Sequence, residues 1–350
     1  MNNWEIFKEN TEPHDGIEKL PPPPSWRPFG QENRPGESRL KRRGETFQAR
    51  SDEVKMVNAA LYLRRPLLVT GKPGTGKSSL AYAVARQLKL GEVLYWPVTT
   101  RTTLKEGLYS YDAIGRLQEV KQQERLNNQT FSSEQYREQI QQIEKYITLG
   151  PLGTALLPSK YPRVLLIDEI DKSDIDLPNN LLAILEEGLF EIPELVRIKK
   201  EVNKVTVRTA YSDETEAETG SQMEAEIENG RITCTAFPLV VMTSNGERDF
   251  PAPFLRRCLP LRMKSPTEEE LTKIVTAHFN QNTAEQEKIQ TLIKKFIDLQ
   301  DEKTLATDQL LNAIFMVTKG RIPVTEGKSF FDDELVKQLL QDLGRAEAED

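Results

Sequence analysis

The sequence has few of the residues that build metal centres and disulfide frameworks. Its 350 residues include only two cysteines and two histidines. Two cysteines, Cys234 and Cys258, form neither a disulfide framework nor a four-ligand zinc site, and so sparse a use of cysteine is typical of a reducing compartment. The histidines, His14 and His278, lie in separate segments, so a histidine-based metal site is not expected either.

Long apolar runs are also missing. No stretch approaches the roughly 20 apolar residues of a membrane-spanning helix, and the N-terminal residues lack the charged-then-apolar pattern of a secretory signal. We therefore expect a cytoplasmic protein without a membrane segment.

Positively charged residues are outnumbered by negatively charged ones. The sequence has 47 Lys and Arg residues and 54 Asp and Glu residues, which gives a net charge of −7. This balance disfavours a general DNA-binding surface, although a local basic patch stays open.

The composition that remains suits a globular protein of about two domains, because 37% of the residues are apolar and 29% are charged. Residues 1–43 are predicted to be a tail. Pro21–Pro24 favours an extended polyproline conformation, and basic residues follow it. Two interpretations stay open: a disordered arm, or a docking segment whose anchors are Trp4, Trp26 and Phe29.

From residue 44 to residue 264 the pattern alternates between helices and short apolar strands. The predicted elements are a helix from Ser51 to before Pro66, a strand at Leu67–Val69, a helix at Ser78–Leu88, a strand at Glu92–Val98, a strand at Val164–Ile167, a helix at Leu177–Leu185 and a strand at Phe237–Met242. Strands that alternate with helices indicate a parallel sheet, so we predict a three-layer α/β domain.

Two segments interrupt this alternation. In the first, 102–147, the part after residue 116 is polar and rich in glutamine, with sparse apolar positions such as Leu117 and Ile143. We predict an exposed helical insertion there rather than an element of the core. The second, 197–233, alternates apolar and polar residues and is acidic from Asp213 to Glu228. We predict a β-hairpin with a long, flexible acidic tip.

A change of character at Pro266 marks the start of a helical domain, predicted to span residues 265–350. Ser265 is the expected cap, Pro266 the first helical residue, and Glu268–Glu270 supply acids in the first turn. Amphipathic segments follow near 284–299, 307–318 and 332–342, with no strand pattern among them.

The strongest motif is Gly71-Lys72-Pro73-Gly74-Thr75-Gly76-Lys77-Ser78, which fits G-x-x-x-x-G-K-[ST] at every position and lies between a predicted strand and a predicted helix. Glycines let the backbone N–H groups of such a loop turn inward around a phosphate group. Lys77 adds a cation toward the β- and γ-phosphates, and the Ser78 hydroxyl is the expected Mg²⁺ ligand. We predict that the whole loop and Ser79 bind a nucleotide.

Two further strands end in polar residues that suit phosphate chemistry. The apolar run Val164–Ile167 ends in Asp168 and Glu169, at the edge of the sheet where α/β sites lie. Asp168 is predicted to hold Mg²⁺ through water, and Glu169 to polarise the attacking water. The run Val240–Met242 leads to Asn245, which is placed to bond the γ-phosphate or that water.

Two adjacent arginines complete the set of candidates. Arg256 and Arg257 stand at the end of a predicted helix, and an arginine stabilises the charge on transferring phosphoryl oxygens. Surface arginines without a role are the alternative interpretation of this pair.

This order of motifs resembles the AAA+ ATPases, over about residues 44–320, and more narrowly the MoxR-type branch. The narrower resemblance is carried by Gly150-Pro151-Leu152, by the run from Asp168 to Ser173, and by the helix at Leu181–Glu187. Segments at Trp96–Thr103, Tyr111–Ile114 and Phe237–Val241 also resemble MoxR-like ATPases of bacterial conflict systems.

The resemblance implies a P-loop core followed by a small all-α lid, and rings that are usually hexameric, with ATP bound between neighbouring subunits. Arg257, beside Arg256, then matches the arginine finger of the adjacent subunit, and Asn245 matches the first sensor. The segments 102–147 and 197–233 match family insertions, and either one is a candidate for substrate or partner contacts. Gln309 aligns with a lid arginine that touches the γ-phosphate. Because an amide lacks that charge, slow turnover is expected, unless Arg321 compensates.

The sequence therefore predicts an ATPase with Mg²⁺ that remodels or activates a protein partner. Two alternatives stay open: a nucleic-acid translocase motor similar to the motor subunit of modification-dependent restriction systems, and a scaffold whose assembly is gated by nucleotide. The sequence also leaves ATP or GTP, the partner and the ring size open.

Overall fold

The computed structural model describes residues 6–7, 13–24, 44, 47–127, 142–211, 223–279, 283–302, 305–318 and 334–342. Two compact units make up the chain. The sheet unit consists of Ala49–Thr70 and Lys77–Arg262, and the helical unit consists of Met1–Gln48, Gly71–Gly76 and Met263–Asp350. Within the predicted tail, Gly16–Lys19 form a short 3₁₀ helix, η1. The proposed anchors Trp4, Trp26 and Phe29 lie outside the described residues.

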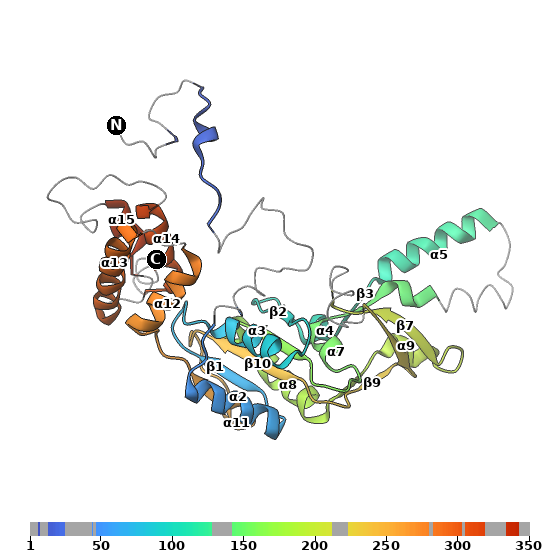
Figure 1. The fold of residues 1–350 in the computed structure, drawn as a ribbon. Coiled ribbons are helices and arrows are strands. Elements are labelled where there is room, and N and C mark those ends of the chain that lie inside the picture. The colour runs from blue at the N-terminus through green and yellow to red at the C-terminus, as the bar shows by residue number, and fades with distance from the viewer. Residues whose placement is uncertain are drawn as a thin grey trace. The chain divides into compact units, whose positions relative to one another are not determined.

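The centre of the sheet unit is a parallel sheet, as predicted, and it has five strands (Figure 1). Its strands, in spatial order, are β11 (Leu259–Arg262), β1 (Leu67–Thr70), β10 (Leu239–Ser244), β5 (Val164–Asp168) and β2 (Leu94–Pro97). The sequence did not predict β11. The α/β fold is confirmed, and because all five strands run the same way, the carboxyl ends of β1, β5 and β10 lie on one edge.

Helices connect these strands. They are α2 (Ser51–Leu63), α3 (Lys77–Leu88), α4 (Leu104–Leu108), α7 (Pro151–Ala155), α8 (Asp176–Glu187), α9 (Pro193–Ile198) and α11 (Ala252–Arg257). A short 3₁₀ helix, η3 (Ile170–Lys172), follows β5 directly. Helix α2 ends before Pro66, as predicted. Its last residue is Leu63, and Arg64 adopts a left-handed conformation.

A second, six-stranded sheet joins the two predicted insertions. Its order is β3 (Tyr109–Tyr111), β4 (Ile147–Leu149), β7 (Lys204–Arg208), β8 (Glu224–Glu228), β9 (Arg231–Thr233) and β6 (Leu189–Glu191). The predicted hairpin exists, since β7 and β8 pair antiparallel along their length. The join between the insertions is the parallel pairing of β4 with β7, at Thr148 and Arg208.

Two predictions about these segments were wrong. Ile143 was expected in an exposed helix, but it is only 1% exposed. It belongs to the 3₁₀ helix η2 (Gln142–Tyr146), and its side chain packs in the hydrophobic core that lies under both sheets. Glu224–Glu228, expected in the acidic tip, form strand β8, whose alternating Ala225 and Ile227 face inward. Residues 212–222, the rest of the tip, lie outside the described residues.

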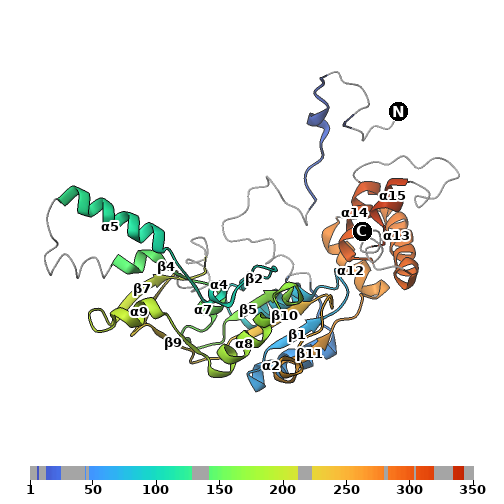
Figure 2. The ribbon, with the colours of Figure 1, turned by 180° about the vertical axis from the view of Figure 1, so that it is seen from behind.

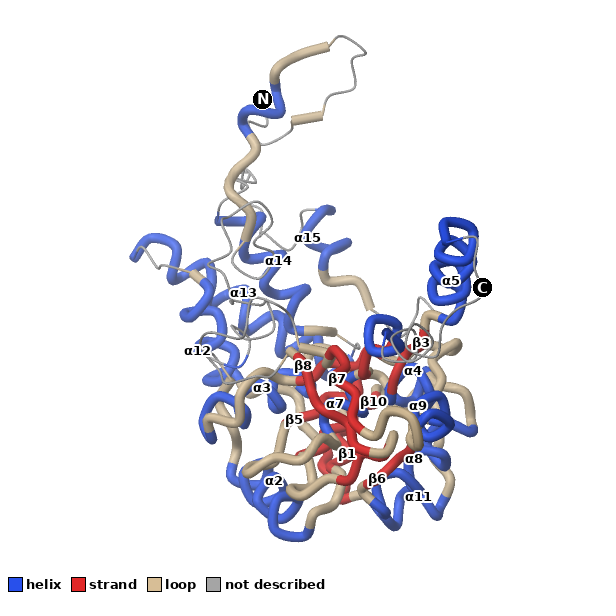
Figure 3. The backbone as a smooth tube through the Cα atoms, turned by 90° about the vertical axis from the view of Figure 1, so that its right-hand side faces the viewer, coloured by secondary structure: helices blue, strands red, loops and turns tan. Residues whose placement is uncertain are grey.

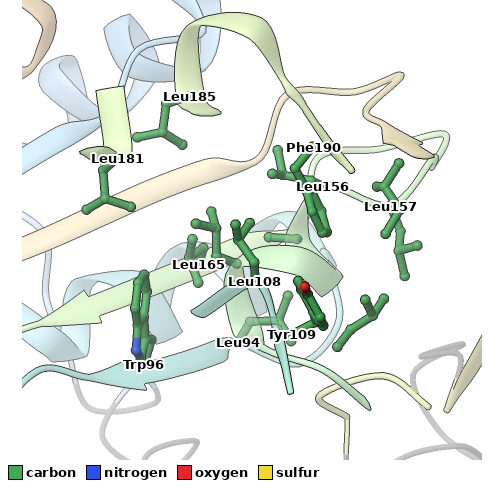
Figure 4. Packing of buried hydrophobic residues seen from close by; sticks show 14 of the residues in the cluster. Leu94, Trp96, Leu108, Tyr109, Leu156, Leu157, Leu165, Leu181, Leu185 and Phe190 are labelled. Carbon is green, nitrogen blue, oxygen red and sulfur yellow. The ribbon is translucent and has the colours of Figure 1, made fainter. Parts of the chain in front are cut away.

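One hydrophobic core underlies both sheets (Figure 4). Leu94, Trp96 and Leu165 come from the parallel sheet, while Tyr109 and Phe190 come from the second sheet, and all belong to one continuous cluster. The second sheet is therefore packed into the domain and is not an appendage.

Helix α5 (Ala113–Asn127) projects away from the second sheet, as the two opposite views show (Figures 1 and 2). Its base is held by Arg116, which donates to the Tyr111 hydroxyl at 3.0 Å, and by a hydrogen bond from the Tyr146 hydroxyl to Glu119. Ile114 and Leu117 are exposed on it. This part of the first insertion is an exposed helix, as predicted.

The helical unit contains α12 (Glu268–His278), α13 (Thr283–Glu302), α14 (Thr307–Thr318) and α15 (Glu334–Leu339), and no strand follows Arg262 in the described residues (Figure 3). The helices enclose their own core. The predicted cap of α12 was wrong: Thr267, not Ser265, accepts from the Glu270 N–H, and Glu270 accepts from the Thr267 N–H. This reciprocal capping places the start of the helix two residues after Pro266.

Candidate active site

Asp168 accepts hydrogen bonds from hydroxyl groups of three neighbouring elements. It is the last residue of β5, and its Oδ1 accepts hydrogen bonds from Ser78 Oγ at 2.7 Å and Thr243 Oγ1 at 2.6 Å. Its Oδ2 accepts from the Tyr95 hydroxyl at 3.4 Å. Ser78 stands in the first turn of α3, so the structure brings together two residues that the sequence predicted to serve the same metal ion.

Lys77 is buried beside Asn245. Its side chain is only 8% exposed, and Nζ donates to Asn245 Oδ1 at 2.7 Å. Burial lowers the pKa of Lys77, and the negative charges of Asp171, Asp168 and Glu169 oppose that shift, in this order. A buried ammonium next to carboxylates at the end of a parallel sheet is the arrangement expected of a group that meets phosphate oxygens.

Glu169 has an unusual backbone conformation. Its φ of 60° and ψ of 48° are left-handed, which costs a residue with a side chain roughly 1–2 kcal/mol. Its N–H donates to Thr243 Oγ1 at 2.9 Å, and Lys172 Nζ donates to its Oε2 at 2.9 Å. This hydrogen bond raises the pKa of Lys172. The turn directs the chain away from β5 directly after Asp168, and strain of this kind gathers at functional sites.

Asp171 is a site residue that our sequence analysis did not assign. It is 3% exposed, and its Oδ2 accepts the backbone N–H groups of Asn245, Gly246 and Glu247 at 2.9, 3.0 and 3.1 Å. The sequence does carry a signal for this residue, since Asp171 is the third acid in the four residues that begin with Asp168 at the end of β5. The short helix η3 turns this third acid back toward the sheet.

In the helical unit, the loop Gly71–Gly76 packs against the start of α14. Gly74 has a φ of +75°, and a Cβ there would lie 2.6 Å from the backbone nitrogen of Thr307, so a side chain has neither the conformation nor the room. Thr307 Oγ1 donates to the Gly74 carbonyl at 2.9 Å. Within the loop, Thr75 Oγ1 donates to the Lys72 carbonyl at 2.9 Å.

A protein-family comparison decides the family. The model of the AAA domain (dynein-related subfamily) matches residues 66–257, which is more than half of the chain. The chain belongs to the AAA domain family, dynein-related subfamily. This confirms the AAA identity and nucleotide binding as the family's general property.

Other comparisons add little to this assignment. The AAA protein is similar in structure to "a putative ATPase from Cytophaga hutchinsonii" with a TM-score of 0.34 and 11% identity, over 69% of this chain and 56% of that chain. The chain thus spans little more than half the length of that structure. No curated protein matches the chain. None of the helices in the described part of this AAA protein combines the length and apolar character needed to cross a membrane.

The two arginines lie at the end of α11. Arg257 Nε donates to Glu186 of α8, and both side chains are about half exposed. Arg256 is exposed. Among the hydrogen bonds of the described residues, none joins these arginines to the group around Lys77 and Asp168, so their contribution to that site stays a prediction.

Gln309 caps its own helix in this AAA protein. Its Oε1 accepts from the Ala306 N–H at 2.8 Å, and its Nε2 donates to the Gln341 carbonyl at 2.9 Å. Thr307, two residues earlier, is the residue of α14 that bonds to the loop. These contacts all lie within the helical unit, and the alignment of Gln309 with a phosphate-binding arginine stays a prediction.

The residues at Asp168 fit a magnesium ion. A hydroxyl and a carboxylate oxygen, Ser78 Oγ and Asp168 Oδ1, already lie 2.7 Å apart. Mg²⁺ is usually bound by one or two protein oxygens, substrate phosphates and several waters. No cluster of three or more His, Cys, Asp or Glu side chains suited to a metal ion occurs among the residues that the structure describes, and Mg²⁺ with a nucleotide does not need one.

The Thr307 contact predicts a measurable effect on nucleotide affinity. Thr307→Val removes the hydroxyl donor but keeps the shape, so the Gly74 peptide loses the bond that fixes its orientation. A hydrogen bond worth about 1 kcal/mol corresponds to roughly a fivefold rise in the ATP Kd, measurable by titration calorimetry. Thr307→Ser is the matched control and keeps the wild-type Kd. Equal affinity in both variants would show that the hydroxyl does not support the loop.

Proposed function

We propose that this protein is an ATP-hydrolysing AAA+ ATPase of the MoxR type, which works as a ring, most simply a hexamer, and remodels or activates a protein partner. The observation that carries the proposal is the convergence of Ser78 and Thr243 on Asp168, next to the pair formed by Lys77 and Asn245. These side chains supply the parts that phosphoryl transfer needs, which are a metal site, a cation for phosphate oxygens and a polar group for water.

The chain's own residues have distinct roles in binding. The backbone N–H groups of Gly71–Gly76 and the ammonium of Lys77 bind the phosphates of ATP. Ser78 and, through water, Asp168 hold Mg²⁺, which neutralises charge on the β- and γ-phosphate oxygens when bound. Thr243 keeps Asp168 Oδ1 oriented by its hydrogen bond.

Glu169 acts on the attacking water. Lys172 occupies Oε2 of this carboxylate, so Oε1 is the oxygen that accepts the proton of the water. The water oxygen forms a bond to the γ-phosphorus, and the bond from that phosphorus to the β–γ bridging oxygen breaks, which releases ADP and phosphate. Asn245 holds the water or the γ-phosphate in line. Arg257 of the adjacent subunit stabilises the charge on the transferred phosphoryl group.

Substitution of Glu169 tests the hydrolytic function. Glu169→Gln keeps the size of the side chain but cannot accept a proton, so ATP binds with an affinity close to wild type while kcat falls by roughly 100-fold or more. Lys77→Ala is the contrasting variant and loses ATP binding. The measurements are steady-state phosphate release and equilibrium ATP binding. Equal turnover by wild type and Glu169→Gln would instead favour the nucleotide-gated scaffold.

A mixing experiment tests the shared site. Arg257→Ala and Glu169→Gln proteins are each inactive alone, but a mixed ring contains sites with Glu169 from one variant and Arg257 from the other. Random mixing of equal amounts restores roughly a quarter of the wild-type sites, since each site needs both neighbours in one order. Arg256→Ala is the matched control. Absence of any recovery in rings shown to be mixed contradicts the role of Arg257 in trans.

The second sheet and α5 are the proposed partner-binding region. Most of this region comes from the segments 102–147 and 197–233, to which β4 and β6 are added, and the parallel sheet does not require it. Helix α5 exposes Ile114 and Leu117 at its base. Function carried by segments outside a conserved scaffold is common in α/β proteins.

Capture from a lysate tests for a partner. Glu169→Gln protein with ATP is expected to retain a protein that the Lys77→Ala protein does not, because the first is held in the ATP-bound state. Replacing Ile114 and Leu117 by serine is expected to reduce this capture by about tenfold, as loss of two apolar contacts does, while ATP hydrolysis stays unchanged. Capture that is independent of ATP and of these residues contradicts the proposed region.

A further inference from the structure

Asp171 lies between the ends of two neighbouring strands. It belongs to η3, which follows β5, and it accepts three backbone N–H groups from the turn that follows β10. Because β5 and β10 are paired in the sheet, these two turns meet at the edge where Lys77 and Asp168 lie. The carboxylate is buried, and these hydrogen bonds all come from backbone N–H groups.

The turn at 245–247 is shaped to bind an anion. Its three successive N–H groups point at one oxygen, Asp171 Oδ2, at 2.9–3.1 Å. Gly246 has a φ of +83°, and a Cβ there would meet nothing within 4 Å, so glycine is needed for the conformation and not for space. Consecutive amides in such a turn form a concave anion site, and bonds to a charged acceptor are stronger than neutral ones. Here the anion is a side chain of the protein.

This contact fixes the backbone of the residue whose side chain meets Lys77. Asn245 donates its own N–H to Asp171 and accepts at Oδ1 from Lys77 Nζ at 2.7 Å. A second tie joins the same two turns, since Arg248 Nη1 donates to the Ser173 carbonyl at 2.7 Å. The backbone of Asn245 is therefore held directly by Asp171, and the turn that contains it is held by Arg248 as well.

The second oxygen of Asp171, Oδ1, is buried and has no hydrogen-bond partner among the residues that the structure describes. A buried carboxylate with an unpaired oxygen is unfavourable for stability alone, which indicates that its position serves another purpose.

We propose that Asp171 is a positioning residue for ATP hydrolysis, which holds the turn at 245–247 so that Asn245 stays in line with the γ-phosphate and the attacking water. This inference rests on the proposed ATPase function. Asp171 does not touch the substrate, so its loss affects the rate of the chemical step more than the binding of ATP.

The test compares Asp171→Ala and Asp171→Asn with Asp174→Asn, an exposed aspartate in the same segment. Misplacement of a reacting group by about 1 Å costs on the order of 100-fold in rate, so we expect kcat of Asp171→Ala to fall at least tenfold, with KM within about threefold of wild type. Asp171→Asn keeps an acceptor for the three N–H groups and loses less. Asp174→Asn retains wild-type kcat.

Hydrogen exchange of the amides at 245–247 provides a readout that does not depend on activity. These amides are expected to exchange faster in Asp171→Ala and to stay largely protected in Asp171→Asn. If Asp171→Ala does not fold, the test is the comparison of Asp171→Asn with Asp174→Asn, and kcat is expected to be lower in Asp171→Asn.

Two kinetic results overturn the inference. One is a kcat of folded Asp171→Ala protein equal to that of wild type, and the other is a rise in the KM of this variant as large as the fall in its kcat.

The proposed function fails separately if wild type hydrolyses ATP no faster than Glu169→Gln. In that case, amide protection at 245–247 that is the same in Asp171→Ala as in wild type overturns the inference on its own.

Discussion

The parallel pairing of β5 with β10 is the constraint on which the site depends. Its register sets Met242 beside Ile167, so the next residues of the two strands, Thr243 and Asp168, are neighbours at the sheet edge. The Thr243 hydroxyl then bonds both to the Asp168 carboxylate and to the N–H of Glu169. A shift of either strand by one residue would turn these side chains to the opposite faces of the sheet, and the hydrogen bonds between Thr243, Asp168 and Glu169 would be lost. The apolar residues of both strands, fully buried, are what hold this register.

Strands and helices of the α/β domain were predictable because their signals are local. An apolar run of strand length, a glycine-rich loop and a helix rich in alanine define β1, the phosphate loop and α3 without any knowledge of distant contacts. The polar ends of β5 and β10 were predictable for the same reason, since parallel strands present their carboxyl ends at one edge. The structure brings Lys77, Ser78, Asp168 and Asn245 together as the sequence indicated.

What the sequence did not reveal depends on contacts between distant segments. The pairing of β4 with β7 joins residues about 60 positions apart, and nothing local in either strand identifies the other as its partner. Ile143 appeared to be an isolated apolar residue in a polar segment, because its burial depends on that sheet. Asp171 was passed over because its role lies in three backbone groups of a different turn.

The shared core of the two sheets has a mechanical consequence. Tyr109 and Phe190 of the second sheet pack in the same cluster as Leu165, which lies on β5 three residues before Asp168. Densely packed interiors have low compressibility and pass displacement from one side chain to the next. A displacement of the second sheet is therefore passed to β5, the strand that ends at Asp168, through packed leucine and aromatic side chains.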